Sequence, residues 1–268
     1  MSIYYKESVV YFEEAINSMW EQTVPPEEIV LVCDGPLTEE LDKSIGDMQS
    51  MHSSLHVVRL EKNSGLGNAL NVGIKHCKND LIARMDTDDI SRTDRCERQL
   101  SVFSSMPEID ICSGTIEEFT DSISIVNNRR VTPETHDQII AFSKKRNPFN
   151  HPCVMYRKTA VEAAGGYQDF YLLEDYYLWI RMLQNGSHGY NIQEPLLWMR
   201  AGSAMYKRRS GWKYARSQKE LFKYMYTEGI ITRSDYFRSA FIRGASSLTP
   251  NWIRRMAFKS LLRENASE

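Results

Sequence analysis

Long hydrophobic stretches, paired cysteines and an excess of glycine or proline are all missing from this sequence. No apolar run reaches the roughly 18 residues that a membrane-spanning helix needs, so we expect no transmembrane anchor. With 14 Gly and 9 Pro in 268 residues, a fibrous or disordered chain is excluded. A hydrophobic content of 42% and a net charge of −2 instead indicate a globular protein of one large domain or two small ones.

Cysteine usage favours a reducing compartment. The five cysteines are odd in number and form no C-x-x-C pair, which argues against a disulfide framework or a zinc site. Residues 1–7 contain no basic segment followed by an apolar one, so no secretory signal is visible. We therefore expect a cytoplasmic protein whose cysteines are reduced core thiols.

The near-zero net charge conceals a strongly basic C-terminal part. Residues 200–268 hold 15 Lys and Arg against 5 Asp and Glu, together with 11 aromatic residues, whereas residues 1–199 carry a net charge of −12. A basic and aromatic surface suits anionic lipid headgroups. Nucleic acid would also be attracted to it, although we expect none as a partner. A helical region whose Lys and Arg form a solvated face is an equal alternative.

The first 106 residues alternate helix and strand patterns. Apolar residues recur at helical spacing from Ser8 to Trp20, and the continuous apolar run 29–33 is typical of a strand buried on both faces. The elements expected next are a helix near 37–51, a strand 55–60, a helix to about 77, a strand 80–85 and a helix 92–106. This alternation predicts a mostly parallel α/β sheet. The first strand, 2–4, is very short, yet it has to lie near the centre of such a sheet.

The second half of the chain loses this regularity. The patterns predict strands near 109–119 and 123–129, a helix near 134–143, a strand 153–157 and a helix 174–184. We therefore expect a mixed rather than a parallel sheet here. The buried side of the last helix is predicted to consist of Leu178, Trp179, Met182 and Leu183.

An acidic turn follows the strand 80–85. The carboxylates of Asp86 and Asp88 can project to one side of the turn and share a divalent cation with phosphate oxygens, which indicates a metal–diphosphate site. A calcium loop is an alternative, but Ile90 and Ser91 stand where such a loop needs a ligand and a glycine. Acidic residues that offset a helix dipole are a further alternative.

Two more features indicate nucleotide binding at the same edge of the sheet. Asp34 follows a buried strand and can accept a hydrogen bond from a base such as uracil, although it is also a typical turn residue. Gly65 and Gly67 precede a helix and can offer backbone N–H groups to an anion. Ligands bind beyond the carboxyl ends of parallel strands, where all these residues converge.

Other candidate groups lie downstream. Glu174 or Asp175, at a helix start, can act as general base for a hydroxyl nucleophile, or can be an ordinary N-terminal helix charge. The run Lys207–Arg209 could close over a leaving diphosphate, or could be solvated surface. His151 and Pro152 could line an acceptor pocket or form a turn.

A set of motifs makes the interpretation specific. In chain order they are Met-Ser-x-Tyr (1–4), Val-Cys-Asp-Gly (32–35), Asn-x-Gly-Leu-Gly-x-Ala-Leu-Asn-x-Gly-Ile (63–74), Ala-Arg-Met-Asp-Thr-Asp-Asp (83–89), His-Pro-x-Val-Met (151–155), Gly-Gly-Tyr (165–167) and Glu-Asp-Tyr-x-Leu-Trp-x-Arg (174–181). The set covers about residues 1–210 and resembles glycosyltransferase family 2. The resemblance implies an α/β GT-A fold and inverting transfer from a nucleotide-sugar.

The resemblance also implies roles for single residues. Ser2, Tyr4 and Asp34 are expected to contact the base and ribose, Asp86 the ribose or the metal, and Asp88 the Mn²⁺ or Mg²⁺ ion. The other expected contacts of the nucleotide-sugar are Gly65, Asn71, Arg208 and Arg209.

On the acceptor side, the resemblance makes Asp175 the general base, with Glu174 beside it. His151 and Trp179 are expected to contact the acceptor. Similarity to bacterial exopolysaccharide and O-antigen members favours a UDP-linked hexose and an acceptor saccharide on a polyprenyl diphosphate. A peripheral position on the inner face of the cytoplasmic membrane is then expected.

This interpretation divides the chain into three parts. Residues 1–200 form the GT-A domain, with a nucleotide-sugar half over about 1–106 and an acceptor half over about 107–200. Residues 201–268 form a basic, aromatic-rich helical C-terminal region.

Two departures from the family pattern concern the metal and the diphosphate. Some relatives carry an arginine where Gly65–Gly67 lies, and others use a late histidine as metal ligand, whereas this chain has no histidine after His188. We therefore expect modest metal affinity.

Two rival functions remain. A sugar-phosphate nucleotidyltransferase would need a glycine-rich and basic segment near the first strand, which residues 4–7 lack. A catalytically inactive nucleotide-sugar-binding module is disfavoured by the presence of Asp86, Asp88 and Asp175.

Overall fold

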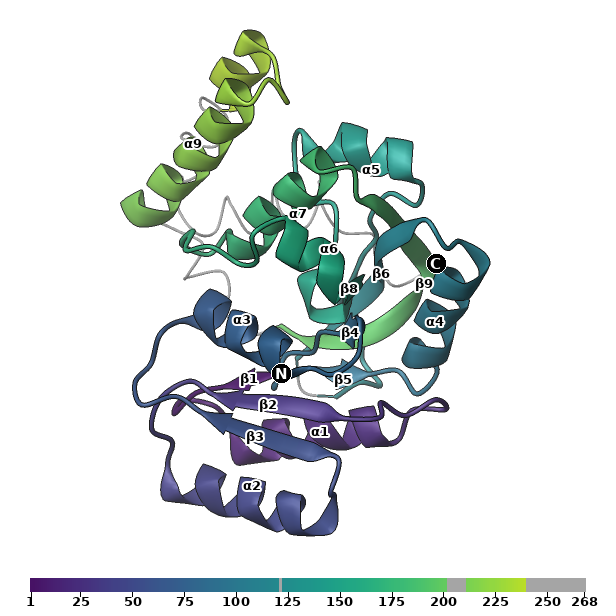
Figure 1. Cartoon of the computed structure of the whole chain (residues 1–268), viewed down its shortest axis with the longest axis vertical. Coiled ribbons are helices and arrows are strands. Elements are labelled where there is room, and N and C mark those ends of the chain that lie inside the picture. Colours follow the sequence, from purple (N-terminus) through teal and green to yellow (C-terminus); the bar gives the residue numbers. More distant parts are fainter. Residues whose placement is uncertain (121, 202–210, 240–268) are drawn as a thin grey trace.

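The computed structural model describes residues 1–120, 122–201 and 211–239 as two β-sheets surrounded by helices (Figure 1). The first sheet has three parallel strands in the order β1 (Ser2–Ile3), β2 (Ile29–Cys33) and β3 (Leu55–Arg59). The expectation that β1 lies near the centre was wrong, because β1 is an edge strand of this sheet. Thr87 belongs to the acidic turn, and its hydroxyl donates to the Ser2 carbonyl of β1. The acidic turn therefore lies beside this edge strand.

Helices cover both faces of the first sheet. Their bounds are α1 (Val9–Trp20), α2 (Glu39–Met51) and α3 (Leu66–His76). Leu31 and Cys33 belong to the core cluster that α1 and α2 complete, whereas Val30 and Val32 pack with Ala69 of α3. The apolar run of β2 is therefore continuous because both of its faces are covered, as predicted.

The second sheet is mixed, as expected for this half of the chain. Its strands are, in spatial order, β4 (Leu81–Ala83), β8 (Met155–Arg157), β6 (Ile109–Phe119), β9 (His188–Arg200) and β5 (Ile90–Ser91), with β7 (Asn128–Arg130) paired to β6. Its one parallel pair among the described residues is β6 with β9. The prediction that β4 would continue the parallel sheet was wrong, because β4 pairs antiparallel with β8.

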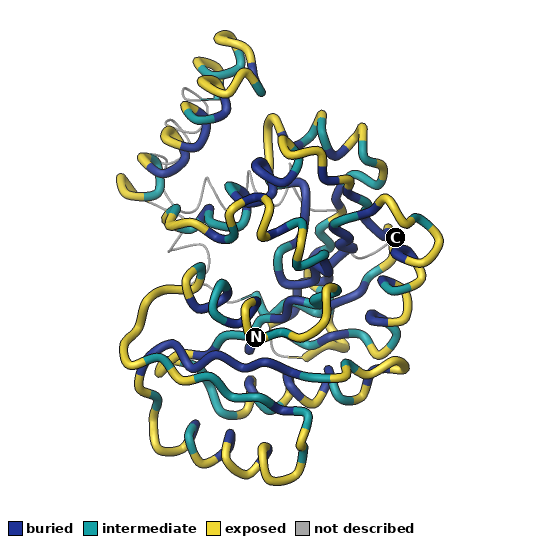
Figure 2. The backbone as a smooth tube through the Cα atoms, in the orientation of Figure 1, coloured by how far each residue is buried: buried dark blue, intermediate teal, exposed yellow. Residues whose placement is uncertain are grey.

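The remaining helical elements pack around the second sheet and beyond it. They are α4 (Arg95–Ser105), α5 (His136–Ser143), η1 (His151–Cys153), α6 (Lys158–Ala163), α7 (Glu174–Gln184) and α9 (Trp212–Thr227). Leu178 and Met182 of α7 lie in the core on one side, while Ile180 joins Leu221 and Phe222 of α9 on the other. One side of α9 is accordingly buried in Figure 2 and the opposite side is exposed.

A C-terminal helix was predicted, and α9 confirms a helical start to that region. The predicted domain boundary at residue 201 adjoins residues 202–210, which lie outside the described part of the chain, so that boundary stays a prediction. Among the described helices, none combines the length and the apolar composition needed to cross a bilayer.

Candidate active site

The acidic turn follows β4 at the junction of the two sheets. Oxygen atoms of the Asp86, Asp88 and Asp89 carboxylates all lie within 4.8 Å of one another. The backbone N–H of Arg84 donates to the Val154 carbonyl at 2.9 Å, which fixes the start of the turn on the second sheet. Three oxygen ligands of this kind suit a hard divalent cation.

Arg84 is the buried counter-ion of this turn. Its side chain is 2% exposed, and its two terminal nitrogens donate to the two oxygens of Asp86 at 2.6 and 2.5 Å. Such a bidentate pair fixes the orientation of the Asp86 carboxylate. Sequence reasoning missed Arg84, although an arginine two residues before an acidic cluster is a usable signal.

Arg84 does not balance the negative charge of all three carboxylates in the turn. Burial, followed by the charges of Asp86 and Glu7, raises the pKa of Asp88 to about 7. Burial and Asp88 likewise raise the pKa of Asp89 well above its usual value. A divalent cation would supply the missing positive charge, so the residues present fit a metal ion, with Asp88 and Asp86 as its expected ligands.

Arg200, at the end of β9, ties the acidic turn to the second sheet. Its backbone N–H donates to Asp89 Oδ1 at 2.8 Å, and its Nε donates to the Asp88 carbonyl at 3.1 Å. Its guanidinium also pairs with Glu14 at 2.5 Å and lies 3.8 Å from the Tyr11 ring centre. Sequence reasoning counted Arg200 merely within the basic C-terminal part, because no local pattern connects residues so far apart.

Asp34 lies at the carboxyl end of β2, as predicted, but it bonds to protein groups. It is 4% exposed, and its carboxylate accepts from the backbone N–H groups of Ser64 at 2.7 Å and Gly65 at 3.0 Å. The Gly65 amide that we expected to face an anion is thus engaged by Asp34. Asp34 shapes the loop before α3, and a Cβ on Gly35 would lie 2.6 Å from the Asn63 nitrogen of that loop.

Ser2 and Tyr4 adjoin the acidic turn. Ser2 is half-buried in β1, and its carbonyl accepts from Thr87 at 3.3 Å. The Tyr4 side chain is 38% exposed and meets the Tyr5 ring edge-on. The structure therefore brings these two predicted nucleotide contacts to the same edge as Asp86 and Asp88.

Asn71 bonds to the turn before α7. Its amide nitrogen donates to the Tyr167 carbonyl at 2.6 Å, and its amide oxygen accepts from the Tyr167 N–H at 2.8 Å. Both polar ends of the side chain are thus used within the protein, and the expected contact of Asn71 with the nucleotide-sugar stays a prediction. Gly166 allows this approach, since a Cβ there would lie 2.7 Å from the Asn71 oxygen.

Glu174 and Asp175 are the first two residues of α7. Asp175 Oδ2 accepts from the Asn147 amide at 2.6 Å. A Cβ on Gly67 in the first turn of α3 would lie 3.8 Å from the Cβ of Glu174, so the starts of α3 and α7 are adjacent. Burial and then the neighbouring Asp175 raise the pKa of Glu174 to about 7.

His151 and Trp179 belong to one aromatic cluster. His151 Nε2 shares a hydrogen bond of 3.0 Å with the Tyr167 hydroxyl, and burial, with Arg84 second, lowers the pKa of His151 well below its usual value. Trp179 is 0% exposed, so its side chain is enclosed by protein, and its expected contact with an acceptor stays a prediction. It lies on the buried side of α7 and packs against the rings of His151 and Tyr167.

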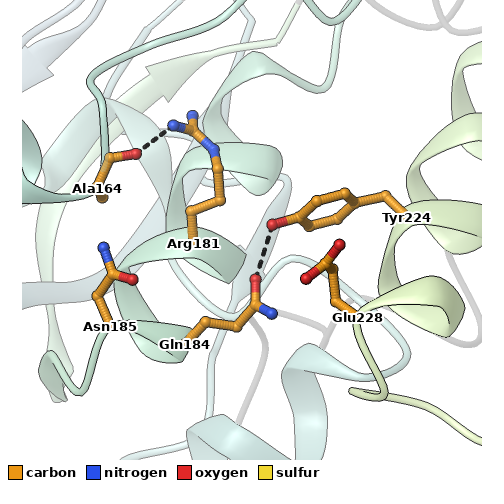
Figure 3. A pocket seen from close by; sticks show the side chains of 6 residues that line it. All are labelled: Ala164, Arg181, Gln184, Asn185, Tyr224 and Glu228. Atoms are coloured by element: carbon orange, nitrogen blue, oxygen red, sulfur yellow. Dashed lines mark hydrogen bonds between the residues drawn. The ribbon is translucent and has the colours of Figure 1, made fainter.

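Arg208 and Arg209 lie outside the described residues, so their expected contact with the diphosphate stays a prediction. A separate cavity of about 350 Å³ lies between α7 and α9 (Figure 3). Its lining residues are Ala164, Arg181, Gln184, Asn185, Tyr224 and Glu228. Helix α7 begins at Glu174 and ends at Gln184, so this cavity lies at the opposite end of α7 from Glu174 and Asp175.

Two bacterial relatives match nearly the full length of this chain. A UDP-Gal:α-D-GlcNAc-diphosphoundecaprenol β-1,3-galactosyltransferase of Escherichia coli is 37% identical over 263 residues, which are 98% of this chain and 95% of that protein. The amylovoran biosynthesis glycosyltransferase AmsE of Erwinia amylovora is 38% identical over 97% of this chain and 96% of its own length.

The fold is also shared with a solved structure of much lower sequence identity. The mannosyltransferase PcManGT of Pyrobaculum calidifontis, solved with GDP-Man and Mn²⁺, superposes with a TM-score of 0.63 at 15% identity, covering 96% of this chain and 72% of its own. This likeness confirms the predicted α/β GT-A fold. The sequence profile of glycosyl transferase family 2 matches residues 2–165. Together with the two close relatives, this match shows that the chain belongs to glycosyltransferase family 2.

Proposed function

We propose that this glycosyltransferase moves a hexose, with inversion, from a UDP-sugar to a saccharide carried on a polyprenyl diphosphate. The observation that carries the proposal is the arrangement of two acidic groups around Arg84. Burial raises the pKa of both Asp88 and Glu174, and the charge of this buried guanidinium acts on both in the opposite direction, so it lies near both groups. One group suits a nucleotide diphosphate with its cation, and the other suits an acceptor hydroxyl.

The substrate classes are supported by the relatives. The E. coli relative is named for UDP-Gal and for GlcNAc-diphosphoundecaprenol, and the Erwinia relative for amylovoran biosynthesis. Both match nearly the full length of this chain. We therefore take UDP-galactose and an α-GlcNAc-diphospholipid as the first substrates to test.

In this proposal, metal binding and proton removal are assigned to different residues of the chain. Asp88 and Asp86 would hold Mn²⁺ or Mg²⁺, which supplies Lewis-acid stabilisation of negative charge on a diphosphate. Asp175 accepts the proton of the acceptor hydroxyl, whose oxygen attacks the anomeric carbon from the face opposite the UDP. The bond between the anomeric carbon and the diphosphate oxygen breaks in the same step, so the configuration inverts.

A lipid-linked acceptor requires contact with a membrane surface, and α9 supports one. Its exposed side carries Lys213, Arg216, Lys219 and Lys223, together with Trp212, which is 78% exposed. The opposite side of the helix is buried. We propose that this face of α9 lies against anionic headgroups on the cytoplasmic side of the membrane.

The decisive test is transfer of radiolabelled galactose to a synthetic GlcNAc-diphospholipid with Mn²⁺ present. We expect Asp175→Asn and Asp88→Ala to lower kcat by at least a hundredfold, since each removes a group acting on the reacting atoms. Asp47→Asn, which changes an exposed carboxylate of α2, is the matched control. Wild-type turnover by Asp175→Asn would refute the assigned base.

The same assay separates the rival functions. Formation of a nucleotide-sugar from a sugar phosphate and UTP would indicate a nucleotidyltransferase. UDP binding without transfer or hydrolysis of any UDP-sugar tested would indicate an inactive binding module.

A further inference from the structure

A rigid loop between α5 and η1 presents Asn147 to the candidate base. Phe149 is fully buried and meets the Trp179 ring edge-on at 5.9 Å. The Pro148 carbonyl accepts from the Asn191 amide at 3.1 Å, and Asn150 donates through its side chain to two backbone carbonyls. The backbone on the C-terminal side of Asn147 is thus held from several directions.

The orientation of the Asn147 amide follows from its two partners. Its oxygen accepts from the Phe149 N–H at 3.3 Å. Its nitrogen therefore faces Asp175 and donates to Oδ2 at 2.6 Å. An amide turned the other way would set oxygen against carboxylate oxygen and nitrogen against an N–H group, losing both bonds.

The two oxygens of Asp175 differ in their surroundings. Oδ2 is engaged by Asn147, whereas no side-chain or backbone donor within the described ranges bonds to Oδ1. A neutral amide fixes the carboxylate plane without the full opposing charge that an arginine or lysine would bring. One oxygen is therefore held and the other is left to accept a proton.

We propose that Asn147 is the positioning residue of the general base, holding Asp175 so that Oδ1 faces the acceptor hydroxyl. This inference rests on the proposed function, in which Asp175 removes the acceptor proton. Asn147 itself touches neither substrate. It acts through the orientation of its neighbour.

The charged and titratable groups near Asp175 include Glu174 beside it on α7, Tyr167 on the preceding turn and Arg84 after β4. Substitution of Asn147 leaves all three in place. Loss of the Asn147 bond lets the Asp175 carboxylate turn about its side-chain torsions, so Oδ1 faces the acceptor hydroxyl in fewer molecules. A fall in kcat with an unchanged KM for UDP-galactose thus reports on this bond.

The experiment compares Asn147→Ala and Asn147→Asp in the galactose-transfer assay. We expect Asn147→Ala to lower kcat by about tenfold to a hundredfold, with the KM for UDP-galactose within about twofold of wild type. Asn147→Asp keeps an acceptor for the Phe149 N–H but has no N–H group to donate to Asp175, so it should lower kcat at least as far.

The matched control is Asn79→Ala, which removes an amide-to-carboxylate bond of 2.8 Å to Glu27 on the exposed surface. It should leave both kcat and KM unchanged. If Asn147→Ala fails to fold, as judged by its thermal transition, Asn147→Asp alone decides. Wild-type kcat in a folded Asn147 variant, with Asp175→Asn inactive, would overturn the inference and leave the proposed function intact. Wild-type activity of Asp175→Asn would instead remove the proposed base itself.

Discussion

Single buried carboxylates determine how the acidic turn responds to protons and cations. Arg84 engages both oxygens of Asp86, while burial, followed by neighbouring carboxylates, raises the pKa of Asp88 and of Asp89. A carboxyl that is more basic in the folded than in the unfolded chain holds its proton more tightly when folded. Ionisation of the turn therefore works against folding unless a cation is bound.

The first prediction concerns pH and Asp88. Its folded pKa of about 7 exceeds its usual 3.8, so its contribution to stability is fully present below pH 4 and is lost as pH rises towards 7. In chelator-treated protein, Asp88→Asn should be more stable than wild type at pH 8 by about 2 kcal/mol, allowing for partial solvent exposure. The difference should vanish near pH 4.

Urea unfolding of both proteins at several pH values measures this difference. The difference in unfolding free energy between the two proteins excludes the contribution of groups that both contain. One such group is His151, whose lowered pKa favours folding as pH rises. Asp137→Asn, in the first turn of α5, serves as a control for the loss of one carboxylate. A wild type that is equally or more stable than Asp88→Asn at pH 8 would contradict the prediction.

Residue type and local order predicted part of the site. Asp86 and Asp88 follow a strand and Glu174–Asp175 begin a helix, and the charge of Arg84 acts on Asp88 and on Glu174. Trp179 shows the limit, because its helical spacing had already placed it on the buried side of α7. The motif that contains it does not distinguish a side chain that contacts a ligand from one that supports the site from behind.

At the level of elements, the site depends on how α3 and the turn before α7 are joined. Asn71 of α3 pairs with both backbone polar groups of Tyr167, as a neighbouring strand would. Gly166, with φ of 64°, leaves room for this contact. The two halves of the active site are therefore aligned by one amide side chain.

The second stability prediction follows from this contact. Asn71→Ala removes two hydrogen bonds and leaves the Tyr167 backbone groups without those partners, so it should destabilise the protein by about 2–3 kcal/mol. The KM for UDP-galactose of the folded fraction should stay within about twofold. Asn68→Ala, on the exposed side of the same helix, should change stability by less than about 0.5 kcal/mol.

Urea unfolding and initial rates test both parts of this prediction. A variant as stable as wild type but with a raised KM would support Asn71 as a nucleotide-sugar contact. A loss of stability with unchanged KM would support the structural role.

The bounds of helices and strands were predictable where the hydrophobic pattern of the segment fits one type of element. The bounds of β2 and α7 match the expected ones, since a continuous apolar run and a helical stripe are both unambiguous. β9 was missed because Pro195 and several polar residues interrupt its pattern, and the proline falls where the register with β6 shifts. The partner of β4 is a non-local property that no segment of sequence specifies.

At the level of the whole molecule, charge is divided between two surfaces. The acidic turn and α7 start lie within the α/β part, whereas the exposed cations of α9 lie on the helix packed behind α7. Tyr177 and Tyr224 meet edge-on at 4.9 Å across this contact, and the Tyr224 hydroxyl donates to Gln184 at 2.9 Å. The proposed membrane face and the proposed base therefore share one supporting helix.

The last prediction concerns membrane contact. Wild-type protein should sediment with vesicles containing phosphatidylglycerol at low salt and be released at high salt. Each cation near the surface contributes roughly 1 kcal/mol, so changing Lys213, Arg216, Lys219 and Lys223 to Gln should weaken binding by at least a hundredfold. Lys43→Gln with Lys78→Gln, two exposed lysines outside α9, is the control. Equal sedimentation of the four-residue variant would exclude α9 as the contact.

The packing of α9 on α7 also has a geometric consequence. If α9 rests on headgroups, α7 lies above the bilayer by about one helix diameter, roughly 10–12 Å. The height of Asp175 over the lipid is then set by the fold and does not depend on the acceptor. Only a hydroxyl at that height can reach Oδ1, so the enzyme would select acceptors by the length of the saccharide between the lipid and the sugar that receives the hexose.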